Sequence, residues 1–132
     1  MAVGKMKTSP DRFSFVITGK IKPYVRMTAR GKYVKRQAQE YLASKGSISL
    51  QFAEQMIHAG MQTFDKADKL GITAVIVRHE QRGDIDNIAK AILDAGNGVV
   101  YSDDRQLRKM DITLVDDKKR EPSAQIFFEI LS

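Results

Sequence analysis

The sequence has no cysteine and no apolar run long enough to cross a bilayer. Without cysteine, the chain can form neither a disulfide framework nor a thiolate zinc site. A membrane-spanning helix needs about 20 mostly apolar residues, and no signal-peptide core follows Met1. These absences argue against a membrane protein and against a disulfide-stapled secreted domain. They predict a cytoplasmic location with no membrane partner.

Acidic residues are scarce in the first third of the chain. Residues 1–45 carry eleven Lys and Arg but only two acids, a local charge of +9. The other 87 residues carry eleven bases and fourteen acids, or −3, which together give the net charge of +6. A basic segment of this kind is typical of proteins that bind a polyanion, because counterion release supplies much of the affinity. A well-charged soluble surface explains the same pattern, so charge alone leaves nucleic-acid binding open.

Apolar periodicity predicts the fold class. At 132 residues the chain is long enough for one domain, over 1–132, with a buried core. The pattern predicts strands over 13–19, 72–77, 110–114 and 126–130 and helices over 35–59 and 85–95, with Gly46 as a point where the first helix bends or splits. Segment 19–33 is predicted to be an extended basic loop. The order predicts a single compact α/β domain with a mixed sheet of about four strands and two main helices.

A compact acidic region interrupts this basic chain: residues 83–106 read GDIDNIAKAILDAGNGVVYSDDRQ. In an extended segment Asp84 and Asp86 share one face, whereas Ile85 points into the core. Asp86 is then a good N-cap for the helix that follows. Lys90 comes one helical turn later and is expected on the same side as Asp86.

A second acidic pair, Asp103 and Asp104, follows the turn at 96–98 and is expected to return to the same mouth. Two carboxylates ~5 Å apart repel by about 3 kcal/mol at an effective dielectric constant of about 20, and a divalent cation removes this repulsion. Hard oxygen ligands without His or Cys favour Mg²⁺ or Mn²⁺ over zinc. Each part also has a structural explanation as a helix cap, a solvated lysine or a loop tip. The combination favours a metal site.

Two tyrosines lie among the cations of the basic loop. Tyr24 and Tyr33 alternate with Lys and Arg, so their rings are candidates for stacking on unpaired bases while the cations hold phosphates. Packing beneath the loop is an equally good explanation for each ring.

The acidic region resembles the signature of a known family. DIDNIAKAILDAG followed by SDDRQL is similar to the motif of the RusA-type Holliday-junction resolvases, crossover junction endodeoxyribonucleases that prophages often carry. That motif is D-x-D-N, a lysine four residues on, a further D-A, and then D-D-x-Q. The opening GKIKPYVRMTARGKYVK also resembles the basic, proline-containing start of many members, so the resemblance covers nearly the whole chain. It implies a homodimer with two active sites that cuts four-way DNA junctions symmetrically on two strands, in recombination and repair.

The resemblance also implies roles for individual residues. Asp84, Asp86 and Asp104 are implied as metal-binding catalytic acids, Lys90 as the supporting lysine and Asp103 as a further metal neighbour. The acids would hold Mg²⁺, with Mn²⁺ as a substitute, against the scissile phosphate, and Lys90 would stabilise the developing charge. The cations expected to position branched DNA by its backbone are Lys20, Lys22, Arg26, Arg30, Lys32, Lys35, Arg36 and Arg82.

Two alternative functions stay open at this point. One is a general metal-dependent nuclease that acts on flaps, single strands or RNA. The other is a non-catalytic nucleic-acid-binding module, whose acids cap a helix and bind a structural cation.

Overall fold

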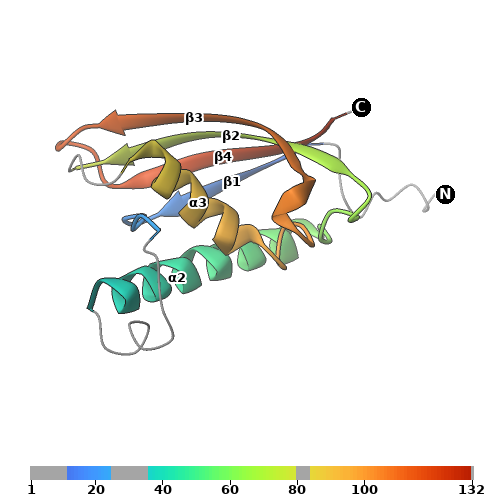
Figure 1. Cartoon of the computed structure of the whole chain (residues 1–132), viewed down its shortest axis with the longest axis horizontal. Coiled ribbons are helices and arrows are strands. Elements are labelled where there is room, and N and C mark those ends of the chain that lie inside the picture. The colour runs from blue at the N-terminus through green and yellow to red at the C-terminus, as the bar shows by residue number, and fades with distance from the viewer. Residues whose placement is uncertain (1–11, 25–35, 80–83, 132) are drawn as a thin grey trace.

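The computed structural model of the chain describes residues 12–24, 36–79 and 84–131. These residues form a sheet of four strands, two α-helices and one short 3₁₀ helix (Figure 1). In chain order the elements are β1 (Arg12–Thr18), α2 (Arg36–Ala59), β2 (Lys69–Arg78), α3 (Ile85–Gly96), η2 (Asp104–Gln106), β3 (Leu107–Asp116) and β4 (Ser123–Leu131). The predicted α/β class with four strands and two helices is confirmed.

The sheet order is β1-β4-β2-β3, which differs from the order along the chain. Strand β4 is antiparallel to both β1 and β2, whereas β2 and β3 are parallel. A parallel pair needs a crossover connection, and α3 supplies it. Because Asp84 follows β2 and directly precedes α3, the first acidic pair lies beyond the carboxyl end of β2.

Both helices cover the same face of the sheet (Figure 1). The core between the two layers is aromatic: the Phe15 and Phe52 rings meet edge to face with centroids 4.8 Å apart, and Phe128 packs against both. Helix α2 runs through Gly46 without a break, so the split considered from the sequence is absent. No described helix covers the opposite face, where Val16 and Val75 stay exposed.

Two glutamine side chains of α2 occupy the outer edge of β1. Gln55 accepts from Val16 N at 3.0 Å and donates to Val16 O at 2.7 Å. One helical turn earlier, Gln51 accepts from Thr18 N at 2.8 Å and donates to Thr18 O at 3.1 Å. Each carboxamide therefore satisfies one residue of an edge that would otherwise present unpaired backbone groups.

None of the described helices is long and apolar enough to cross a membrane.

Candidate active site

The first acidic pair stands at the N-terminus of α3. Asp84, with φ −75° and ψ 157°, is the N-cap, and its carbonyl accepts from Ile88 N at 3.1 Å. The predicted N-cap, Asp86, was wrong: it lies within the first helical turn, because the helix begins at Ile85. Ile85 is 44% exposed and does not point into the core as expected. Both carboxylates nevertheless lie at the positive end of the helix dipole, where anionic groups are stabilised.

The carboxylates of Asp84 and Asp86 are available to a ligand. Both residues are exposed, and the Asp84 side chain makes no capping hydrogen bond. Among the described residues, no hydrogen bond or ion pair engages either carboxylate. Two hard oxygen groups two residues apart at a helix N-terminus suit a divalent cation such as Mg²⁺.

Lys90 lies one turn after Asp86 on the exposed side of α3, as predicted. Its Nζ sits 4.2 Å from the centroid of the Tyr24 ring, a cation–π contact. Tyr24 is held in turn, since its backbone N donates to Asn87 O at 3.0 Å and its ring meets Tyr41 edge to face. In this structure Tyr24 therefore packs against the helix and orients Lys90. Tyr33 lies outside the described residues.

A tight turn returns the chain to the end of α3. Gly98 adopts a φ of +81°, which L side chains rarely adopt, and its N donates to Tyr101 O at 2.7 Å. Gly96 lets the Tyr101 ring approach closely, because a Cβ there would stand 3.0 Å from the ring. The Tyr101 hydroxyl donates to Leu93 O. This turn fixes η2, and with it the second acidic pair, beside the C-terminal end of α3.

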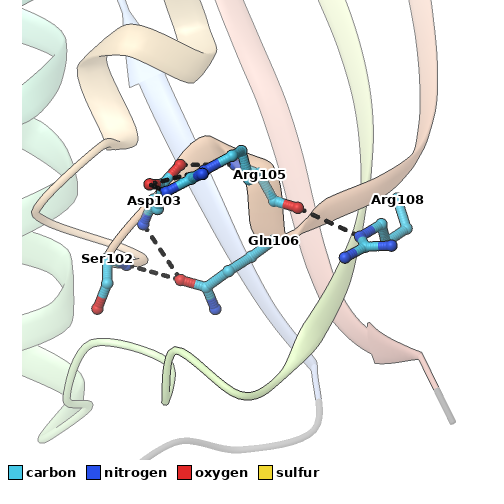
Figure 2. Close-up of polar contacts among 5 residues, drawn as sticks. All are labelled: Ser102, Asp103, Arg105, Gln106 and Arg108. Atoms are coloured by element: carbon cyan, nitrogen blue, oxygen red, sulfur yellow. Dashed lines mark hydrogen bonds and ion pairs between the residues drawn. The ribbon is translucent and has the colours of Figure 1, made fainter.

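The two members of the second pair have different environments, and Figure 2 shows that of Asp103. Asp103 caps η2: its carboxylate accepts from Arg105 N at 2.9 Å and from the Arg105 guanidinium at 2.9 and 3.2 Å. These bonds lower the pKa of Asp103 from 3.8 to about 2. The ionised Asp103 carboxylate therefore stabilises the folded protein above pH 3.8, and this stabilisation is lost as the pH falls through about 2. Asp104 is exposed. Burial raises the pKa of the Tyr101 phenol, and the negative charge of Asp104 raises it further.

The two acidic pairs flank opposite ends of α3. A helix of 12 residues is about 18 Å long, so the second pair does not return to the mouth formed by Asp84 and Asp86. Accordingly, no three acidic or histidine side chains in the described part of the chain are grouped closely enough to hold a metal ion. One copy of the chain therefore places one acidic pair at each end of α3.

Asp94 has a structural role that the sequence did not reveal. It lies one turn beyond Lys90, and it accepts a hydrogen bond of 2.7 Å from the Tyr41 hydroxyl. Tyr41 is buried, and burial together with this hydrogen bond raises the pKa of its hydroxyl. The bond ties α3 to α2. Tyr41 was identified from the sequence only as an apolar position of the helix, since periodicity does not indicate which polar group its hydroxyl meets.

Gln106 is the one buried polar side chain among the described residues. Its Oε1 accepts from Ser102 N at 3.0 Å and from Asp103 N at 3.2 Å, while its Nε2 donates to Asp65 O at 2.9 Å and Asp68 O at 3.0 Å. All four hydrogen-bonding positions of the carboxamide are used. The glutamine side chain therefore joins η2 to the loop that precedes β2 by hydrogen bonds.

Three of the eight predicted DNA-binding cations are described: Lys20, Lys22 and Arg36. Arg36 Nε lies 3.0 Å from Glu40 and Lys22 Nζ lies 4.0 Å from it, so two of the three share one carboxylate near the start of α2. Lys20 is exposed two residues before Lys22, and its carbonyl accepts from the Ser44 hydroxyl. The other five lie outside the described residues: Arg26, Arg30, Lys32, Lys35 and Arg82.

The described structure thus places exposed acids at both ends of α3, with Lys90 between them. Comparison with family models identifies the family of the chain. The chain belongs to the endodeoxyribonuclease RusA family, whose model matches residues 8–129, nearly the whole chain. Membership implies a hydrolase of DNA phosphodiester bonds that acts on Holliday junctions and depends on a divalent metal. A search of curated proteins finds no match.

Proposed function

We propose that the chain is a Mg²⁺-dependent resolvase that cuts four-way DNA junctions by paired symmetric nicks, as a homodimer. The observation that carries the proposal is the pair of exposed carboxylates at the start of α3, which no described residue engages, in a chain of the RusA family. A purely structural capping role leaves this arrangement unexplained, because Asp84 makes no side-chain capping bond. Mn²⁺ is the expected substitute.

The donor set fits Mg²⁺. Asp84 and Asp86 offer oxygen atoms only, and neither histidine is grouped with them in the described structure. We assign the third ligand to Asp104 rather than Asp103, because Asp103 is already bonded to Arg105. When bound, the cation would supply an activated water and positive charge for the phosphate.

The chain's own side chains then have separate tasks. Lys90 carries positive charge one turn from Asp86 and is oriented by Tyr24, so it would contact the scissile phosphate and stabilise charge that develops on it. The cations near the start of α2 would hold the DNA by its backbone. Backbone contacts suit the recognition of branch shape, which needs few base contacts.

A second copy of the chain would complete the site. In a two-fold dimer in which α3 packs antiparallel to its counterpart, the N-terminus of each helix lies beside the C-terminus of the other. Asp84 and Asp86 of one copy would then meet Asp104 of the partner subunit, and two equivalent sites would form. This arrangement accounts for the separation of the acidic pairs within one chain and for two cuts on one junction.

An apolar strip is available for this contact. Ile85 and Leu93, which are two turns apart, lie on the side of α3 away from Asp94 and α2. On the helix side of the neighbouring edge strand, Met110 is 52% exposed, and Ile112 and Leu114 are only partly buried. We propose that these side chains pack against the same strip of the partner subunit.

Mixing two inactive variants tests the shared site. Asp86→Asn and Asp104→Asn are each expected to lose cleavage as homodimers. In a mixed dimer one site would collect both substitutions and the other neither, so the mixture should regain single-strand nicking of a junction. If each site belonged to a single chain, both sites of the mixed dimer would be broken, and the mixture would stay inactive.

Matched surface variants test the interface. Met110→Asp is expected to shift the protein to monomer in analytical ultracentrifugation and to abolish cleavage. Val16→Asp changes a side chain of nearly equal exposure, 53% against 52%, on the opposite edge strand, and should leave a dimer. A Met110→Asp protein that remains dimeric would contradict the proposed surface.

Lys90→Ala is expected to slow junction cleavage roughly 100-fold, the usual scale for removing one group that stabilises transition-state charge. Because Lys90 is exposed, the circular dichroism spectrum and the thermal midpoint should change little. Lys90→Arg keeps the charge and the ring contact and should retain more activity. An unchanged single-turnover rate in Lys90→Ala would refute the role.

The proposed function itself is tested on a synthetic four-way junction with Mg²⁺ or with EDTA, beside linear duplex, flap and RNA substrates. Paired symmetric nicks on the junction, dependent on Mg²⁺, are the expected result. Equal cutting of all substrates would favour a general nuclease. Junction binding without metal-dependent cutting would favour a non-catalytic module.

A further inference from the structure

A hollow of about 450 Å³ lies beside η2, between the loop before β2 and the segment 102–108. We call it the η2 pocket. Four cations line it, together with two carboxylates, the Ser102 hydroxyl and the Gln106 carboxamide; the cations are Lys66, Lys69, Arg105 and Arg108, and the carboxylates are Asp68 and Asp103. The lining therefore carries an excess of positive charge next to the exposed Asp104.

The two walls of the η2 pocket are fixed to each other. Gln106 Nε2 donates to the carbonyls of Asp65 and Asp68. Asp65 directly precedes Lys66, and Asp68 directly precedes Lys69. Figure 2 shows the other wall, where Asp103 forms an ion pair with Arg105. The Arg105 carbonyl accepts a hydrogen bond from Arg108 Nε at 3.2 Å. The cations are thus set on a rigid frame although they come from segments about 40 residues apart in sequence.

The position of Arg108 follows from an irregularity in the sheet. Leu70 pairs with Leu107 and Gly71 pairs with Lys109, so the register shifts and Arg108 has no partner in β2. A bulged residue of this kind is re-aimed away from the regular alternation of the strand. No described residue bonds the Nη atoms of Arg108, and no described ion pair engages Lys66 or Lys69. These groups are free to bind an anion.

We propose that the η2 pocket binds a phosphodiester group of the DNA backbone, as a contact surface separate from the basic N-terminal segment. The proposal rests on the proposed function, because Asp104 places the pocket next to the scissile strand. Lys66 and Arg108 provide the main contacts, and the bidentate geometry of a guanidinium suits phosphate oxygens. Arg105 is already paired with Asp103, so it forms part of the pocket wall and is not proposed as a main phosphate contact.

The test measures how binding of a labelled four-way junction depends on salt, with EDTA present so that no cutting occurs. Each lost phosphate contact should reduce the slope of log K against log salt concentration by about 0.9 and weaken binding about eightfold at 0.1 M salt. Lys66→Gln/Arg108→Gln is therefore expected to lose close to two units of slope, and Arg108→Gln close to one.

Lys109→Gln is the matched control, because Lys109 follows Arg108 in the chain, is exposed and pairs with Gly71 on the uncovered face. Its slope should equal that of the unaltered protein. Equal slopes for Arg108→Gln and Lys109→Gln would overturn the proposal, as would a change in dimerisation rather than in DNA binding. Failure of the proposed function would instead appear as absence of Mg²⁺-dependent junction cutting by the unaltered protein.

Discussion

Asp86→Asn is expected to reduce junction cleavage by roughly 10²–10³-fold or more while junction binding persists. The substitution removes one negative charge from the carboxylate pair at the start of α3 but keeps the side-chain volume. Asp86 is exposed and no described residue is bonded to its carboxylate, so the fold loses only the favourable interaction of that charge with the dipole of α3. Single-turnover cleavage at saturating Mg²⁺, together with a binding isotherm in EDTA, measures both quantities.

Asp111→Asn controls for the loss of a surface charge, because Asp111 is exposed on β3 and faces away from the helices, paired with Thr73. Its cleavage rate should match that of the unaltered protein. Raising the Mg²⁺ concentration should recover part of the Asp86→Asn activity if the lost carboxylate is a metal ligand. A variant that cuts at the normal rate would remove Asp86 from the site.

Gln106→Glu is expected to destabilise the protein by about 3 kcal/mol, because a carboxylate would face the carbonyls of Asp65 and Asp68 where Nε2 now donates to both. That loss corresponds to a fall of roughly 10 °C in the thermal midpoint. The change is isosteric, so the effect reports the hydrogen bonds and the charge rather than packing. Urea unfolding at pH 7, followed by circular dichroism, gives the free energy directly.

Gln125→Glu is the matched control, since Gln125 is exposed on the uncovered face of the sheet. It should change the free energy of unfolding by less than about 0.5 kcal/mol. The deficit of Gln106→Glu should shrink in acid, where the buried carboxyl is protonated and one carbonyl regains a donor. Equal stability of the two variants would mean that Gln106 does not hold η2 to the loop.

The fold class can be predicted from the sequence because apolar residues recur about every 3.6 residues in the helices and every second residue in the strands. Ile88 and Ile92 on α3, and Ile126 and Phe128 on β4, are all buried as predicted. The sheet order was out of reach. Strand β4 inserts between β1 and β2, and such pairing depends on the burial of whole strands rather than on any local signal.

The residue types of the candidate site are readable from the sequence, but their placement is less so. Asp84 and Asp86 are both good capping residues. The prediction that Asp86 is the N-cap was wrong, because the helix begins at Ile85 and Asp84 is the cap. Placing Asp104 needs the length of α3 and the path of the following turn, where Tyr101 packs against Gly96. The roles of Asp94 and Gln106 depend on partners about 40 to 50 residues away, which spacing along the chain does not reveal.

The pairing of Gln51 and Gln55 with β1 determines how far strands of this protein can associate. With Val16 and Thr18 already satisfied by side-chain amides, an incoming strand would find the backbone groups of these two residues occupied. In the proposed dimer, whose contact follows α3 and β3, the capped part of β1 would face outward on both copies. The addition of a further sheet at β1 is then disfavoured, which would oppose growth beyond two copies.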